Sequence, residues 1–79
     1  PVTYLPEEDA ITAAAQALNI QAKEIPVSAQ AMLVYTPSTI TQSRAYPFWK
    51  VIFKDITLYV SQESQVYKLS GLIPRLYGR

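Results

Sequence analysis

The sequence predicts an α+β fold, in which one N-terminal helix packs on a three- to four-stranded antiparallel sheet. Apolar residues near the start of the chain recur at helical spacing, whereas those in the second half alternate with polar residues as in strands. The strands of that half are joined by turns too short for a parallel crossover. A chain of 79 residues is expected to form a single small domain, residues 1–79.

The helix is predicted over residues 6–19. Pro6 suits the first helical position, where a missing N–H costs nothing. Negative charge in the first turn complements the helix dipole, and three acids stand there: Glu7, Glu8 and Asp9. Four apolar residues share one face at the i, i+3, i+4, i+7 spacing of a buried stripe: Ile11, Ala14, Ala15 and Leu18. Asn19 is expected to end the helix in the left-handed conformation, with Ile20 folding back onto the last turn.

Four strands are predicted, at about residues 28–36, 47–54, 56–61 and 65–69. Alternation assigns six residues of the middle two strands to the core: Trp49, Val51, Phe53, Ile56, Leu58 and Val60. The opposite, solvent-exposed face is predicted to carry Lys50, Lys54 and Tyr59. The first strand shows little contrast between its two faces, so its pattern does not decide which one is buried.

Residues 70–79 are expected to be an irregular tail, because Gly71, Pro74 and Gly78 interrupt its apolar residues. The tail would either dock on the sheet or reach a partner. The sheet should also leave a strand edge open to an extended peptide, unless the tail covers that edge.

Composition favours a contact surface over a catalytic or metal site. Charged residues are only 16% of the chain, against about 25% in typical domains. Few charges and six tyrosines suggest that some apolar surface meets a partner. The alternative is that the tyrosines merely cover a small core. With no cysteine and no histidine, the chain has no disulfide, and we expect no metal site and no cofactor.

Charge is uneven along the chain. Residues 1–40 carry four acids and one lysine, a net charge of −3, and residues 41–79 carry six cations and two acids, a net charge of +4. The cations are scattered rather than clustered, which disfavours nucleic-acid binding. No apolar run reaches the roughly 20 residues that span a bilayer. The first ten residues hold three acids and no basic residue, unlike a signal peptide.

No arrangement of residues predicts catalysis, so we do not expect an enzyme. Histidine-assisted and cysteine nucleophiles are excluded by composition. A serine–lysine pair is formally possible, for example Ser70 with Lys68, but nothing in the sequence singles this pair out as a nucleophile and its base. Glu7 and its acidic neighbours fan outward from a helix start, and two glycines, Gly71 and Gly78, cannot build a phosphate-binding loop.

The candidate protein-contact surface consists of cations and tyrosines predicted outside the core: Lys50, Lys54, Tyr59, Tyr67, Arg75 and Tyr77. Aromatic rings beside cations on a sheet face can also stack nucleic-acid bases. The alternation puts Trp49 on the face opposite Lys50 and Lys54, which weakens that alternative.

Three segments of the chain resemble a PepSY-type domain: Phe48–Asp55, Leu58–Ser61 and Gln65–Leu69. The alanine-rich helix Glu8–Leu18 also resembles the opening of that family, so the resemblance covers about residues 6–69. This chain has Ser61–Ser64, without glycine, where the family has an Asp…Gly turn. The resemblance implies a non-enzymatic domain with an inhibitory or protein-binding role, of the kind found in protease propeptides and in extracytoplasmic bacterial proteins.

The sequence therefore predicts a small, non-enzymatic protein-binding module, inhibitory or regulatory if the resemblance holds. Its partner would be another protein or a second copy of itself. One alternative is a structural accessory subunit of a larger assembly, suggested by the low charge and the apolar tail. A nucleic-acid-binding module is the less favoured alternative.

Overall fold

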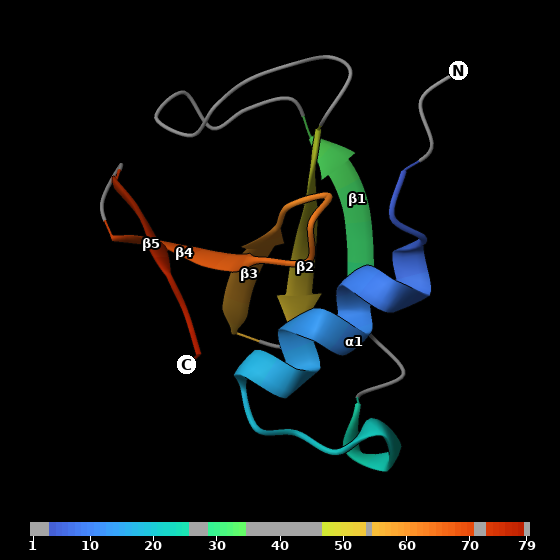
Figure 1. Cartoon of the computed structure of the whole chain (residues 1–79). Helices are drawn as coiled ribbons and strands as arrows, with labels where there is room; N and C mark the ends of the chain where they lie inside the picture. Colours follow the sequence, from blue (N-terminus) through green and yellow to red (C-terminus); the bar gives the residue numbers. More distant parts are fainter. Residues whose placement is uncertain (1–3, 26–28, 35–46, 54, 71–72, 79) are drawn as a thin grey trace.

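The computed structural model describes residues 4–25, 29–34, 47–53, 55–70 and 73–78, and has one helix packed on a five-stranded antiparallel sheet (Figure 1). The elements in chain order are α1 (Glu7–Ala17), the 3₁₀ helix η1 (Ala22–Glu24), β1 (Gln30–Val34), β2 (Phe48–Phe53), β3 (Ile56–Val60), β4 (Val66–Ser70) and β5 (Ile73–Leu76). The strands lie side by side in sequence order, which confirms the predicted α+β class. Neither described helix is long and apolar enough to cross a bilayer.

The strand count exceeds the prediction because part of the predicted irregular tail is β5. This strand pairs antiparallel with β4, and the Tyr77 N–H donates to the Val66 carbonyl at 2.9 Å. Neighbouring residues of a strand direct their backbone groups to opposite sides. Since Tyr77 bonds to β4, Pro74 directs its nitrogen away from β4, where the missing N–H breaks no ladder bond. Proline is therefore compatible with this edge strand.

The end of α1 has the predicted geometry. Asn19 adopts a left-handed backbone conformation with φ of 60°. The Ile20 N–H donates to the Ala15 carbonyl at 2.9 Å, and the Asn19 N–H donates to the Gln16 carbonyl at 3.0 Å. These two bonds form a Schellman motif, which satisfies carbonyls that the helix end would otherwise leave free. The predicted terminator and the folding back of Ile20 are both confirmed.

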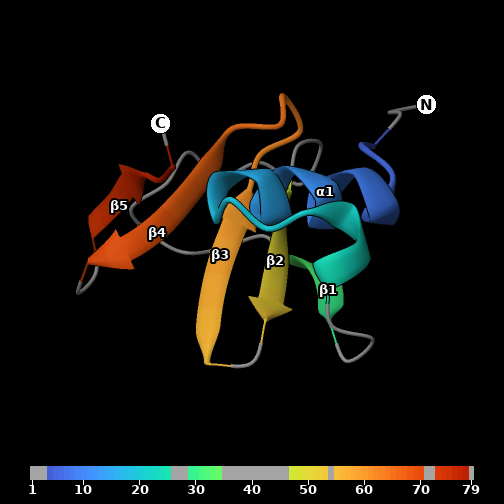
Figure 2. The ribbon, with the colours of Figure 1, turned by 90° about the horizontal axis from the view of Figure 1, so that it is seen from below.

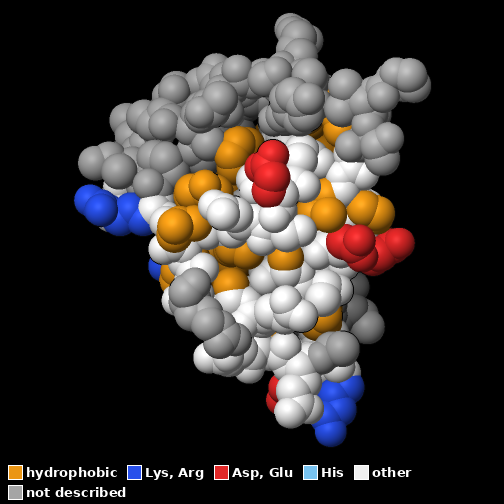
Figure 3. Space-filling view, in the orientation of Figure 1, with side chains coloured by type: hydrophobic (Ala, Val, Ile, Leu, Met, Phe, Trp, Pro, Cys, Tyr) orange, Lys and Arg blue, Asp and Glu red, His pale blue; other side chains and the backbone are white. Residues whose placement is uncertain are grey.

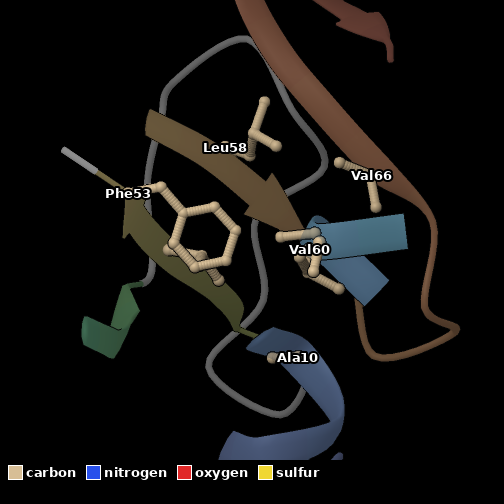
Figure 4. Packing of buried hydrophobic residues seen from close by; sticks show 8 residues of the cluster. Ala10, Phe53, Leu58, Val60 and Val66 are labelled. Carbon is tan, nitrogen blue, oxygen red and sulfur yellow. The ribbon is translucent and has the colours of Figure 1, made fainter. Parts of the chain in front are cut away.

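The core lies between α1 and one face of the sheet, which the helix crosses (Figure 2). Its buried apolar members come from the helix and from strands β2 to β4: Ala10, Ala14, Ala15, Val51, Phe53, Leu58, Val60 and Val66. In Figure 4, side chains of the strands and Ala10 of the helix meet in this space. Trp49 and Ile56 are partly buried against the cluster, so the six predicted core positions of β2 and β3 are confirmed.

A hydrogen-bonded network ties the segment before α1 to the end of the sheet. Gln62, in the β3–β4 turn, accepts a bond from the Leu5 N–H at 2.6 Å through Oε1. Its Nε2 donates to the Pro47 carbonyl at 2.6 Å. The Trp49 indole Nε1 donates to the Leu5 carbonyl at 2.8 Å. Gln62 and Trp49 thus hold both backbone groups of Leu5.

Candidate protein-contact surface

The face of the sheet opposite α1 carries one row of side chains that crosses all five strands. We call it the outer row, and its members face one another in the register of successive strands: Met32, Lys50, Tyr59, Tyr67 and Leu76. Side chains of a strand alternate between faces. Since Val51, Leu58, Val60 and Val66 point into the core, the row members beside them in sequence lie on the other face.

The two ends of the outer row are the most exposed large apolar residues of the described chain. Met32 on β1 is 45% exposed and Leu76 on β5 is 68% exposed. Between them, Lys50, Tyr59 and Tyr67 are partly buried. The register therefore brings together three of the predicted contact residues and adds apolar groups at both sides.

An aromatic contact strengthens this surface next to the row. The rings of Phe48 and Tyr67 meet edge to face, with centroids 5.9 Å apart, the arrangement that aromatic rings prefer. The Tyr67 hydroxyl also donates to Gln65 Oε1 at 3.2 Å. Phe48 was not predicted as a contact residue. It stands two positions before Lys50 on the same strand, and this spacing could have placed it on the same face.

Two predicted contact residues, Arg75 and Tyr77, lie on the helix side of the sheet. Arg75 faces Lys68 across the β4–β5 pair, and Lys68 follows the buried Val66 by two positions, so the two cations share the core-side face beyond the helix. The Lys68 ammonium lies 5.7 Å from the centroid of the Tyr77 ring, within the range of a cation–π contact. Tyr77 is itself partly buried against the core.

The six predicted contact residues consequently do not form one surface. Lys50, Tyr59 and Tyr67 share the outer face, Arg75 and Tyr77 share the other, and Lys54 lies outside the described residues. Seen from the helix side, basic side chains lie at the β4–β5 margin and at η1, and acidic side chains lie near the start of α1 and over the β3–β4 turn (Figure 3).

A shallow cavity of about 390 Å³ lies between the end of α1 and the β2–β3 turn. Its lining is mixed, with four apolar residues and three polar ones: Leu18, Asn19, Ile20, Glu24, Phe53, Asp55 and Ile56. Glu24 is engaged locally, because its Oε1 accepts a bond from the Gln21 N–H at 2.9 Å. Within the described residues, no three acidic, histidine or cysteine side chains are grouped to hold a metal ion.

In comparisons with known proteins, no protein-family model, curated protein or solved structure matches the chain.

Proposed function

We propose that the chain is a small, non-enzymatic protein-binding module whose contact surface is the outer face of its sheet. The observation that carries the proposal is the outer row, in which exposed Met32 and Leu76 flank a lysine and two tyrosines. Contiguous apolar surface on a small soluble domain is typical of interaction sites. Tyrosine in particular gives large contact area together with a polar hydroxyl.

The resemblance to PepSY-type domains supports the same class of function and adds an inhibitory or regulatory role to the proposal. The partner would present an apolar surface with an acidic group placed to meet Lys50. A charge at this position would chiefly select the partner and its orientation, while the apolar neighbours supply most of the affinity.

Site-specific photo-cross-linking in a native extract tests the proposal. A benzophenone amino acid replaces Tyr59 or Tyr67, whose aromatic shape it approximates, and in a matched control it replaces Thr12 on the exposed side of α1. We expect discrete adducts with the same partner protein from Tyr59 and Tyr67, and none from Thr12. Adding Lys50→Glu should remove these adducts.

Equal adduct patterns at all three positions, or no adducts from the outer face, would contradict the proposal. Circular dichroism and the emission of Trp49, the only tryptophan, establish that each variant is folded. A partner captured only through Thr12 would move the contact surface to the helix.

Nucleic-acid binding is a second candidate, favoured by the rings of Phe48, Tyr59 and Tyr67 on the face that carries Lys50. Proteins that bind single-stranded nucleic acids combine aromatic rings, on which the bases stack, with several cations placed along the phosphate backbone. The other cations of the described strands, Lys68 and Arg75, lie on the opposite face. We therefore expect no binding when single-stranded oligonucleotides are titrated at low salt, and saturable, salt-sensitive binding would reverse this ranking.

A further inference from the structure

The two edge strands of the sheet, β1 and β5, differ in the backbone groups that they direct outward. They lie at opposite sides of the sheet (Figure 2). Which groups face outward follows from the pairing register, because hydrogen-bonded and non-hydrogen-bonded pairs alternate along an antiparallel ladder.

On β5, the outward groups belong to Pro74 and Leu76. The bond from the Tyr77 N–H to Val66 makes that pair a hydrogen-bonded one, so the residues at 74 and 76 face away from β4. Pro74 has no N–H to offer. This edge therefore presents a single outward N–H, that of Leu76, and proline on an edge is a common protection against strand addition.

On β1, the outward groups belong to Ala31 and Leu33. Only two residues separate the paired Phe53 and Ile56, so these close the hairpin as a hydrogen-bonded pair. Counting back along β2, the residues at 48, 50 and 52 then bond to β1 at 34, 32 and 30. Ala31 and Leu33 direct both N–H and C=O away from the sheet, and no hydrogen bond from another described residue reaches them.

The side chains of β1 do not oppose strand addition either. Its five residues carry no charge and no proline: Gln30, Ala31, Met32, Leu33 and Val34. Edges that remain unpaired in natural proteins are usually blocked by lysine, proline or a bulge. Among the described residues, one edge of this sheet is thus protected by Pro74, whereas no segment pairs with the other.

We propose that β1 pairs antiparallel with β1 of a second copy of this chain, about a two-fold axis at Met32. Met32 is the central residue of β1, so this axis alone lets the two strands overlap over their whole length. It opposes Ala31 to Leu33 of the second copy, and Leu33 to its Ala31. Both pairs consist of residues with outward groups, so each exchanges two hydrogen bonds.

The axis also brings the two Met32 side chains together as a non-hydrogen-bonded pair, the closer kind of pair in such a ladder. Because β1 is neutral, self-pairing brings no like charges together. A charged peptide, in contrast, would find no opposite charge on β1. The outer faces of the two copies would lie on the same side and meet at Met32, joining two outer rows into one surface.

The expected dimer is weak. Two five-residue strands bury less than the roughly 1,200 Å² of a standard stable interface. We therefore expect a dissociation constant between about 10 µM and 1 mM. Sedimentation equilibrium of the wild-type chain should show its average mass rising from the monomer's 8.9 kDa toward twice that value over this concentration range.

A charge swap at the axis tests the register. Met32→Lys and Met32→Glu should each remain monomeric, with self-association weakened at least about 10-fold, because identical charges would face each other at the closest pair. An equimolar mixture of the two variants should form the dimer again. Leu76→Lys is the matched control, since it places the same charge on an exposed apolar residue of the opposite edge and should dimerise as wild type.

A wild-type chain that stays monomeric to 1 mM would overturn the proposal, as would undiminished self-association of folded Met32→Lys. Loss of the dimer in Leu76→Lys alone would move the interface to β5. Two monomeric variants that fail to associate when mixed would exclude the axis at Met32. Cross-linking through Tyr59 and Tyr67 tests the outer face on β3 and β4, so either proposal can fail while the other stands.

Discussion

Replacing Gln62 with alanine should destabilise the domain far more than the position of this residue in a turn would indicate. The change removes the acceptor of the Leu5 N–H and the donor to the Pro47 carbonyl. It also frees the segment whose Leu5 carbonyl receives the Trp49 indole N–H. All three bonds are partly buried, so water replaces them only in part.

The expected magnitude follows from the two bonds that Gln62 makes. A typical hydrogen bond contributes about 0.5–1.5 kcal/mol net, and a partner left unsatisfied in the interior costs more. Two partly buried bonds therefore give a loss of about 2 kcal/mol. The whole domain has a free energy of unfolding of only about 4–12 kcal/mol at its length of 79 residues. In a domain of this size the loss corresponds to a fall in Tm of about 8–16 °C.

Chemical denaturation measures the stability, and the single indole N–H resonance of Trp49 reports on the network itself. In Gln62→Ala, hydrogen exchange at this indole should become faster and its emission should shift to the red. Gln62→Glu retains an acceptor for the Leu5 N–H but turns a carboxylate oxygen toward the Pro47 carbonyl, so it should also be less stable than wild type.

The matched control is Gln16→Ala on the exposed side of α1, which removes the same side chain where no described hydrogen bond depends on it. Its stability should stay within about 0.5 kcal/mol of wild type. If Gln62→Ala unfolds at the same denaturant concentration as Gln16→Ala, and its indole exchanges at the wild-type rate, then Gln62 does not hold the N-terminal segment.

Three further substitutions, with Met32→Ala as a control, test the backbone and the core by thermal or chemical denaturation. Ser64→Gly should stabilise the domain by about 1 kcal/mol, because Ser64 has φ of 68° and glycine adopts this conformation without strain; a loss of stability would contradict this reason. Gly78→Ala should cost about 1–3 kcal/mol, because its Cβ would lie 2.9 Å from that of Ala17 and its φ is +94°; an unchanged Tm would mean that the C-terminal segment does not pack on α1. Leu58→Ala should cost about 2–5 kcal/mol, since Leu58 is 1% exposed, whereas Met32→Ala on the outer face should cost less than 1 kcal/mol.

The sequence predicted the fold where local patterns act alone. Alternation in β2 and β3 was sufficient to separate core from outer face, because the period of a strand and its short turn fix the facing of both strands. The end of α1 was predictable for a similar reason, since Asn19 tolerates the left-handed conformation better than most residues. Ser64 gave no such signal, although it adopts the same region of backbone space.

The rest depends on residues distant in sequence. Gln62 and Leu5 are 57 positions apart, and nothing in a polar turn identifies one glutamine as the residue that holds the N-terminal segment. The outer row likewise depends on the register of four strand pairs. Local alternation predicted that Lys50 and Tyr59 share a face, but only the pairing of β4 with β5 places Leu76 beside Tyr67 and puts Arg75 on the other side.

The placement of the C-terminal segment bears on the alternative that the chain is an accessory subunit held by its tail. If the tail only held a partner, the domain would fold without it. Tyr77 is partly buried against the core, its N–H bonds to Val66, and Gly78 lies close against Ala17. Removing this segment would expose core surface and the backbone groups through which β4 pairs with β5. A truncated chain that fails to assemble would therefore show a loss of folding rather than the loss of a partner contact. Leu76→Lys separates the two effects, because Leu76 is 68% exposed and its replacement alters the surface of β5 without touching the core.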